Sequence, residues 1–336
     1  MHQSWPPKFF LQDVRNVELM NPSTGWLAIH EQLVEVISEY DFQLEIVPRG
    51  GQLGPVDMDG IYIGKHTRLQ LNNCWNLKKA YIPHYFYFDR TGFAGWAEIA
   101  NNASLFKCAM EVDVSTADEF FRKLYAETVV ANLSKEVQSS DPFMPPPRPF
   151  VFLPLQLSFD NVIKLSRVDH YSFYVALRDW TADLDLCLAI KPHPFAFEGK
   201  TFGRICESTM QILNDAMLHE HVYISYASIH YIIPMSEAVA CINSGVGFEA
   251  LIHHKSVITA GHSDYHWAAH QISSVDDLAK IGNWRMPLLS DADVKKFLCF
   301  FLCDYLVDIR DPRRSIYKCI DRAVDEYKAG LLTGEA

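Results

Sequence analysis

Residues 241–251 read Cys-Ile-Asn-Ser-Gly-Val-Gly-Phe-Glu-Ala-Leu, and this stretch is one half of the most informative feature of the chain. An apolar run stops at a polar, glycine-containing turn, and a second apolar run then starts a helix. A buried strand that ends at the ligand-facing edge of an open α/β sheet has this pattern. Ser244, Gly245 and Gly247 allow the backbone to approach an anion closely, and the N-terminus of the following helix favours a phosphate.

A second motif of the same form lies upstream, where residues 190–194 read Ile-Lys-Pro-His-Pro. Two prolines hold His193 in an extended turn, from which it can donate a hydrogen bond to the same phosphate. Lys191 lies on the same face of the strand, either as a charge for the phosphate or as a solvated edge residue. Glu249 is placed to bond a ribose; the alternative is a first-turn carboxylate that complements the helix dipole.

A third segment, Phe152-Leu-Pro-Leu-Gln-Leu-Ser-Phe-Asp-Asn-Val-Ile163, precedes both motifs. The ordered set resembles the bacterial capsule and lipopolysaccharide β-Kdo transferases, which move 3-deoxy-manno-octulosonic acid (Kdo) from CMP-Kdo. The third segment is similar to the Pro-Leu-Gln-x-x-x-Asp segment of that family, and the likeness covers roughly residues 150–265. The first 150 residues resemble the family only through Asp89-Arg-Thr-Gly-Phe-Ala-Gly-Trp-Ala-Glu98.

Strand and helix patterns alternate along the chain, which predicts an α/β fold with parallel, doubly wound sheets. The segment Asp141-Pro-Phe-Met-Pro-Pro-Pro-Arg-Pro149 predicts a stiff linker between two halves. We therefore expect two Rossmann-like domains facing a cleft, the GT-B architecture, with C-terminal helices. The expected boundaries are an acceptor-side domain at 1–144, a linker at 145–149, a CMP-sugar-binding domain at 150–310 and a C-terminal helix at 311–336.

The individual elements follow from the periodicity of the apolar residues. Before the linker we expect helices at 26–40 and 116–138, strands at 42–47 and 60–63, and an extended segment at 80–88. After it we expect strands at 150–157, 184–190, 221–225, 239–243 and 256–259, with helices at 161–180, 203–219 and 235–239. The tail from 291 to 329 predicts two helices separated near Asp311-Pro312.

Asp160 and His193 are the candidate catalytic residues. Asp160 follows a strand and could act as general base or nucleophile; the alternative is a helix N-cap, and the two roles are compatible. The family resemblance implies retention of the β configuration, which fits a covalent intermediate on Asp160. His193 would stabilise the phosphate as it leaves; the alternative is that it is a turn histidine with no partner. Gln156 would orient Asp160 or contact the sugar.

Two other features have structural alternatives. Gly245 and Gly247 are expected to shape the turn rather than take part in chemistry, and Ser244 could be an ordinary N-cap. In the first half, the loop from Asp89 to Glu98 is the candidate sugar-facing loop; the alternative is a glycine-rich loop that caps a helix at Trp96.

Composition excludes several classes of protein. The 336 residues are 49% hydrophobic, enough for two cores, and a net charge of −11 argues against a nucleic-acid partner. The eight cysteines form no Cys-x-x-Cys pair and predict reduced thiols in the cytoplasm. We expect no signal peptide and no span of ~18 apolar residues, which leaves peripheral membrane association open. The series His262, His266 and His270 lacks a His-Glu-x-x-His arrangement, so no metal is expected.

The sequence therefore predicts a glycosyltransferase that moves Kdo from CMP-Kdo to a bacterial surface polysaccharide or glycolipid, without a cofactor or a metal. One alternative is another donor, CMP-sialic acid or a UDP-sugar. A different class of function is a non-catalytic sugar- or nucleotide-binding module, or a structural partner in a polysaccharide assembly complex.

Overall fold

The computed structural model describes residues 8–13, 25–40, 42–48, 60–65, 73–197 and 206–333. The chain divides into two compact units, one formed by Met1–Asn102 with Cys299–Ala336 and the other by Ala103–Leu298. Each unit contains one six-stranded sheet with helices, so the predicted α/β fold with two Rossmann-like halves is confirmed. The division differs from the expected boundaries. The proline-rich segment at 145–149 lies inside the second unit, and the C-terminal helix belongs to the first.

The second unit carries the motifs, and all the strand pairs in its sheet are parallel. The strand order is β11-β10-β9-β6-β7-β8. From β6 the chain goes first to β7 and β8, then returns to the other side of β6 for β9. The order therefore reverses between β6 and β9, and ligands of open α/β sheets bind at the carboxyl ends of strands at such a point. The strands are β6 (Phe150–Pro154), β7 (Cys187–Lys191), β8 (Val222–Ile224), β9 (Ala238–Cys241), β10 (Ser256–Thr259) and β11 (His270–Gln271).

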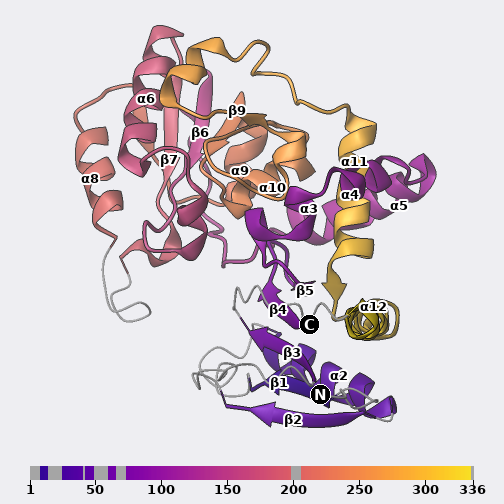
Figure 1. The fold of residues 1–336 in the computed structure, drawn as a ribbon. Helices are drawn as coiled ribbons and strands as arrows, with labels where there is room; N and C mark the ends of the chain where they lie inside the picture. Colours follow the sequence, from indigo (N-terminus) through magenta and orange to yellow (C-terminus); the bar gives the residue numbers. More distant parts are fainter. Residues whose placement is uncertain are drawn as a thin grey trace. The chain divides into compact units, whose positions relative to one another are not determined.

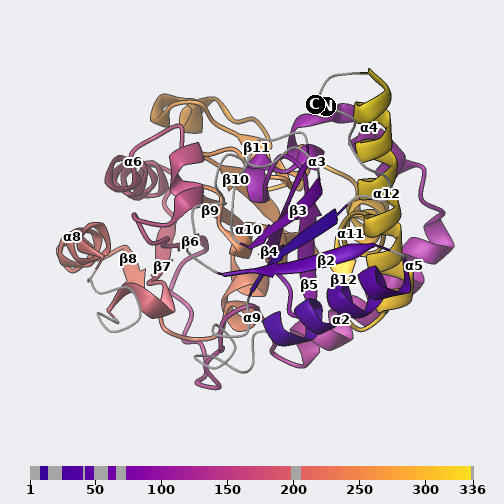
Figure 2. The ribbon, with the colours of Figure 1, turned by 60° about the horizontal axis from the view of Figure 1, so that its bottom comes forward.

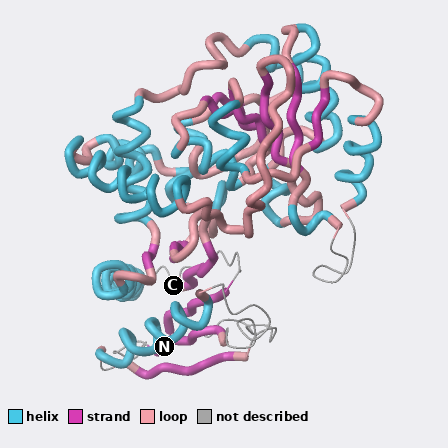
Figure 3. The backbone as a smooth tube through the Cα atoms, turned by 180° about the vertical axis from the view of Figure 1, so that it is seen from behind, coloured by secondary structure: helices cyan, strands magenta, loops and turns pink. Residues whose placement is uncertain are grey.

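Helices flank this sheet, with α6 and α8 to one side of β6 and β7 and α9 and α10 to the other (Figures 1 and 3). Several begin at side-chain caps; Asp169, for example, accepts a hydrogen bond from the Ser172 N–H at 2.9 Å. The helices are α4 (Ala103–Met110), α5 (Val114–Tyr125), α6 (His170–Asp183), α8 (Glu207–Ala216), α9 (Ile229–Ile232), α10 (Gly245–Ile252) and α11 (Asp291–Cys299). Shorter turns are the π-helix η3 (Ala126–Val130) and the 3-10 helices η4 (Asn161–Leu165), η5 (Pro194–Ala196), η6 (Ile233–Met235), η7 (His266–Ala268) and η8 (Val275–Lys280).

The core of the second unit lies between its sheet and helices. Strands β6 and β7 read Phe-Val-Phe-Leu-Pro and Cys-Leu-Ala-Ile-Lys, near-continuous apolar runs of the kind that parallel strands need when both faces are covered. Leu153, Ile190 and Phe173 are at most 1% exposed. This packing holds the carboxyl ends of the strands in fixed register.

The first unit has a sheet of mixed direction, in the order β12-β5-β4-β3-β1-β2. Strands β1 to β4 pair in parallel, whereas β5 runs antiparallel to β4 and to β12. Helices α2 and α12 pack against each other beside these strands (Figure 2). Its elements are β1 (Lys8–Gln12), α2 (Trp26–Glu39), β2 (Gln43–Val47), β3 (Gly60–Lys65), β4 (Cys74–Lys79), β5 (Tyr85–Asp89), η2 (Ala94–Trp96), α3 (Glu98–Asn101), the π-helix η9 (Phe300–Tyr305), β12 (Val307–Asp308) and α12 (Pro312–Thr333).

The helix expected at 116–138 was too long. Regular structure ends at Val130, and residues 131–140, here called the strap, have no helix or strand. Asn132 adopts a left-handed backbone conformation with φ of 54° and ends the helix, as asparagine does more readily than most residues.

Other helices and strands begin or end a few residues away from the positions expected from the sequence. The segment at 80–88 contains the turn between β4 and β5, β4 itself was not predicted, and the short helix lies at 229–235 rather than 235–239. The helix expected at 161–180 is a 3-10 turn followed by α6. The start of the helix expected at 203–219 lies outside the described residues.

Candidate functional site

The two principal motifs follow strands that flank the same central strand. His193 follows β7, Ser244 follows β9, and β6 pairs with both. Because neighbouring strands lie about 4.8 Å apart, the two strand ends are separated by about 10 Å. The structure thus brings the His-Pro turn and the start of α10 to one edge of the second unit's sheet, at the point where the strand order reverses.

The turn before α10 is rigid. The Ser244 hydroxyl accepts a hydrogen bond from the Val246 N–H at 3.2 Å, so Ser244 is the N-cap. The buried Tyr265 hydroxyl donates to the Ser244 carbonyl at 2.5 Å. A Cβ at Gly247 would lie 2.5 Å from that hydroxyl and 2.9 Å from the Cys241 sulfur, so only glycine fits. Gly247 therefore has a structural role, because it leaves room for the Tyr265 side chain, whose hydroxyl holds the turn in place.

His193 carries a donor directed away from its own backbone. Its Nδ1 accepts a hydrogen bond from the Phe195 N–H at 3.2 Å, so the neutral ring holds its proton on Nε2. Burial lowers the pKa of His193 to about 4, helped by the charge of Lys135 and opposed by Asp160. The ring is therefore neutral at pH 7, and no hydrogen bond of Nε2 occurs among the described residues.

Lys191 has backbone partners. Its ammonium donates to the carbonyls of Tyr226 at 3.0 Å and Ala227 at 2.8 Å, in the loop after β8. Burial lowers its pKa. These two bonds fix the loop. They also use most of the hydrogen-bonding capacity of the Lys191 ammonium, for which the sequence suggested a phosphate contact.

Glu249 is a buried carboxyl with an unsatisfied oxygen. It lies in α10, is 2% exposed, and its Oε1 has no hydrogen-bond partner among the described residues. Burial raises the pKa of Glu249 to about 8, although a hydrogen bond from Ser134 and the charge of Lys135 act in the opposite direction. A buried polar atom without a partner is costly, so a ligand that supplied hydroxyl donors there would relieve the cost.

Asp160 is exposed and forms the N-cap of η4, where its side chain accepts from the Val162 N–H at 3.4 Å. That bond is long and leaves the carboxylate free to face a substrate. A small apolar cluster packs the turn that carries Asp160 against the turn that carries His193, through Leu157, Ala196, Cys206, Phe159 and Phe195.

Gln156 has a different partner from the one expected. Its amide pairs with Asn243 in both directions, from Gln156 Nε2 to Asn243 Oδ1 at 3.0 Å and from the Asn243 N–H to Gln156 Oε1 at 3.1 Å. The pair ties the end of β6 to the end of β9. Asn243, which the sequence reading did not select, also donates to the carbonyl of Val162 at 2.7 Å and so anchors the turn after Asp160.

Lys135 is the residue that the sequence reading missed. It lies on the strap, is half-buried, and its charge acts on both His193 and Glu249. The sequence signal that could have found it is Asn132, a residue that favours the left-handed conformation and so ends the preceding helix.

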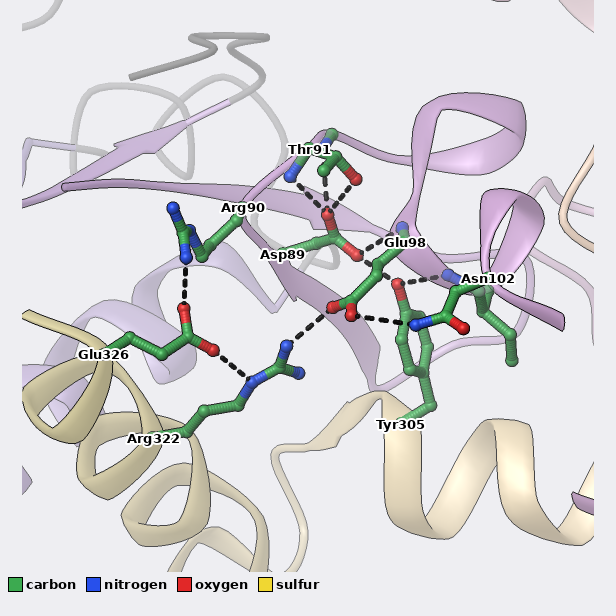
Figure 4. A network of polar contacts seen from close by, with 10 residues as sticks. Asp89, Arg90, Thr91, Glu98, Asn102, Tyr305, Arg322 and Glu326 are labelled. Carbon is green, nitrogen blue, oxygen red and sulfur yellow. Dashed lines mark hydrogen bonds and ion pairs between the residues drawn. The ribbon is translucent and has the colours of Figure 1, made fainter. Parts of the chain in front are cut away.

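The glycine-rich loop of the first unit is organised by Asp89 (Figure 4). The buried carboxylate accepts hydrogen bonds from the Thr91 N–H at 2.6 Å, the Gly92 N–H at 2.9 Å, the Glu98 N–H at 2.9 Å and the Tyr305 hydroxyl. These bonds include the cap of α3, so the structural alternative holds for Asp89. Glu98 forms an ion pair with Arg322 at 2.6 Å, and Arg322 also bonds Glu326 at 2.8 Å.

The three histidines that suggested a zinc pattern do not share a helix. His266 lies in η7, His270 on β11, and His262 in the preceding loop. Within the described ranges, no group of three or more metal-ligating side chains of the His, Cys, Asp or Glu type is close enough to hold a metal ion. No helix in the described part of the chain is both long and apolar enough to span a membrane.

Residues 122–283 match the family model described as capsule polysaccharide biosynthesis protein. This segment, just under half of the chain, is similar to the capsule polysaccharide biosynthesis proteins. The matched segment contains the strap, the His-Pro turn and the start of α10. The family resemblance predicted from the motifs is confirmed.

Two solved structures share the fold over nearly the whole chain. The β-Kdo 2,7 transferase of Thermosulfurimonas dismutans KpsC is 15% identical, with a TM-score of 0.57, and the match covers 95% of this chain and 98% of that one. The β-Kdo 2,4 transferase of the same KpsC is 15% identical, with a TM-score of 0.53, and the match covers 96% and 99%. No curated protein matches the chain.

Proposed function

We propose that this chain is a glycosyltransferase that moves Kdo from CMP-Kdo to a bacterial surface polysaccharide or glycolipid. One observation carries the proposal. His193 and Ser244 follow the strands that flank β6, and Glu249 lies in the helix that Ser244 caps, next to the point where the strand order reverses and inside the segment that matches the capsule biosynthesis family. The similarity in fold to two β-Kdo transferases supports the choice of Kdo as the sugar.

The nucleotide would bind at the start of α10. The N–H groups of the first turn of α10 point toward the carboxyl edge of the sheet, where the helix dipole favours a phosphate. The ribose hydroxyls would donate to the unpartnered Oε1 of Glu249. This contact replaces an unsatisfied buried oxygen with a hydrogen-bonded one, so binding of the nucleotide recovers part of the cost of burying Glu249.

His193 would assist the departure of CMP. Its neutral ring carries the proton on Nε2, from which it donates a hydrogen bond to a phosphate oxygen. As the bond from the anomeric carbon to the phosphate oxygen breaks, the bonding electrons pass to CMP. A donor fixed by two prolines and a backbone hydrogen bond stabilises that charge without having to reorient.

Asp160 would be the nucleophile. One carboxylate oxygen attacks the anomeric carbon as CMP leaves, giving a covalent sugar ester. The acceptor hydroxyl then attacks the same carbon and its proton passes to solvent, while the bond between that carbon and the Asp160 oxygen breaks and Asp160 returns to its carboxylate form. Two displacements retain the configuration at the anomeric carbon. The exposed position of Asp160 and its single weak cap bond support this role.

Release of CMP or UDP from a panel of donors tests the proposal. We expect turnover of CMP-Kdo and little turnover of CMP-sialic acid or a UDP-sugar. Turnover of one of the other donors with none of CMP-Kdo would assign a different nucleotide sugar. Binding of CMP without turnover of any donor, with or without Kdo-containing acceptors, would indicate a non-catalytic binding module instead.

A further inference from the structure

Neither Lys191 nor His193, the described basic residues at the end of β7, supplies a free cation to the predicted donor site. Lys191 donates to two backbone carbonyls, and His193 is neutral at pH 7. A nucleotide sugar of this class carries a negative phosphate, and a sugar acid adds a carboxylate. An anion held in a partly buried site is bound more strongly by a charged donor than by neutral donors alone. The strap provides such a donor.

Hydrogen bonds along the strap attach it to the start of α9, within the same unit. The Ser228 hydroxyl donates to Asn132 Oδ1 at 2.5 Å, and His230 Nε2 donates to the Leu133 carbonyl at 2.8 Å. Further along, the Ile229 N–H donates to Gln138 Oε1 at 3.0 Å. Both ends of the strap are therefore hydrogen-bonded to the start of α9. These bonds fix the residues between Leu133 and Gln138 in place.

A pair of histidines strengthens this attachment. Because His230 uses Nε2 to donate to the strap, its Nδ1 accepts from His253 Nε2 at 3.0 Å. Burial lowers the pKa of both rings, that of His253 to about 3, so both are neutral at pH 7 and the chain of hydrogen bonds is intact.

The start of the strap lies beside the carboxyl end of β7, because Asn132 binds Ser228 and the carbonyl of the neighbouring Ala227 binds Lys191 at 2.8 Å. The positive charge of Lys135 lowers the pKa of both Glu249 and His193. Lys135 is half-buried, and its ammonium makes no ion pair or hydrogen bond within the described ranges. Oε1 of Glu249 is also without a partner among the residues that the structure describes.

We propose that the strap is part of the donor site and that Lys135 binds an anionic group of the nucleotide sugar. This inference rests on the proposed function, because the site is that of the donor. The group is either the phosphate or the carboxylate of the sugar acid. In both cases an ammonium carried by the anchored strap holds the anion next to the donor of His193.

Calorimetric titration of the full chain with CMP and with cytidine tests the proposal, using Lys135→Gln, Lys135→Arg and the control Lys123→Gln. Lys123 is an exposed lysine of α5, and its removal changes the net charge by the same amount. If Lys135 binds the phosphate, Lys135→Gln weakens CMP binding about tenfold or more and leaves cytidine binding unchanged. Lys135→Arg retains most of the affinity, and Lys123→Gln matches the wild type.

A second readout separates the two anions. If Lys135 binds the sugar carboxylate, Lys135→Gln leaves CMP binding unchanged but raises the KM for CMP-Kdo by about tenfold or more. Equal values for the wild type and Lys135→Gln with both ligands would overturn the inference and leave the proposed function standing. Failure of the wild type to bind CMP or to use CMP-Kdo would overturn both.

A third readout needs no ligand. Titration of His193 by NMR in the empty protein should give a higher pKa in Lys135→Gln than in the wild type, because a nearby positive charge has been removed. An unchanged His193 pKa would show that Lys135 does not lie near this site and would overturn the inference.

Discussion

Substitution of Glu249 by glutamine should make the stability of the protein less sensitive to alkali. Burial raises the pKa of this carboxyl from 4.5 to about 8 in the folded protein. The unfolded chain ionises it at its ordinary pKa, so the folded state binds more protons between those two values. Folding stability is therefore lost as the pH rises above 4.5, and the loss is complete above about pH 8.

The size of the effect follows from the two pKa values. Near pH 6 the buried carboxyl costs about 2 kcal/mol, and near pH 9 it costs about 5 kcal/mol, at about 1.4 kcal/mol for each pKa unit. Glutamine does not ionise. Its amide occupies the same position at both pH values, so that contribution cancels in the difference. The stability of Glu249→Gln relative to the wild type should therefore rise by about 2–3 kcal/mol between these conditions.

Urea unfolding of the wild type and Glu249→Gln at both pH values measures this difference. Glu220→Gln is the matched control, because Glu220 is an exposed glutamate of the same unit and its substitution changes the net charge by the same amount. CMP affinity should fall in Glu249→Gln but not in Glu220→Gln. A stability difference for Glu249→Gln that does not change with pH would refute the account of a buried carboxyl awaiting hydroxyl donors.

Three further substitutions test other parts of the structure. Asp160→Asn should abolish sugar transfer while changing stability by about 1 kcal/mol or less, since asparagine caps as well as aspartate; full activity would move the search for the nucleophile elsewhere. Gly247→Ala should destabilise the protein by about 1–3 kcal/mol, because its Cβ would lie 2.5 Å from the Tyr265 hydroxyl; wild-type stability in urea would contradict that packing. Asp89→Asn should cost about 2–4 kcal/mol, because amide hydrogens would face several N–H donors, whereas a change in activity at unaltered stability would favour a role in catalysis.

The sequence predicted the second sheet well because its signals are local. An apolar run followed by a polar turn identifies a buried parallel strand and its carboxyl end together, as at β7 with His193 and at β9 with Ser244. The alternation with helices predicted parallel strands, but not that β9 lies beside β6. The first sheet was harder, since β4 and β5 form an antiparallel pair joined by a short turn, and β5 is a buried run of aromatic residues without a polar alternation.

The strap could not be predicted in the same way. Its position depends on hydrogen bonds to residues far along the chain, such as those from Ser228 and His230. The partners of Lys191 and Gln156 are likewise set by tertiary contacts, with the loop after β8 and with Asn243. Residue type and spacing identified the edge of the sheet that forms the candidate site, but not which of its polar groups are already paired.

A crystal structure of the protein soaked with CMP would locate the nucleotide. We expect the phosphate within hydrogen-bonding distance of His193 Nε2 and of the N–H groups that begin α10, with the ribose hydroxyls on Glu249. CMP bound elsewhere on the chain, or a phosphate that contacts neither His193 nor the start of α10, would rule out this donor site.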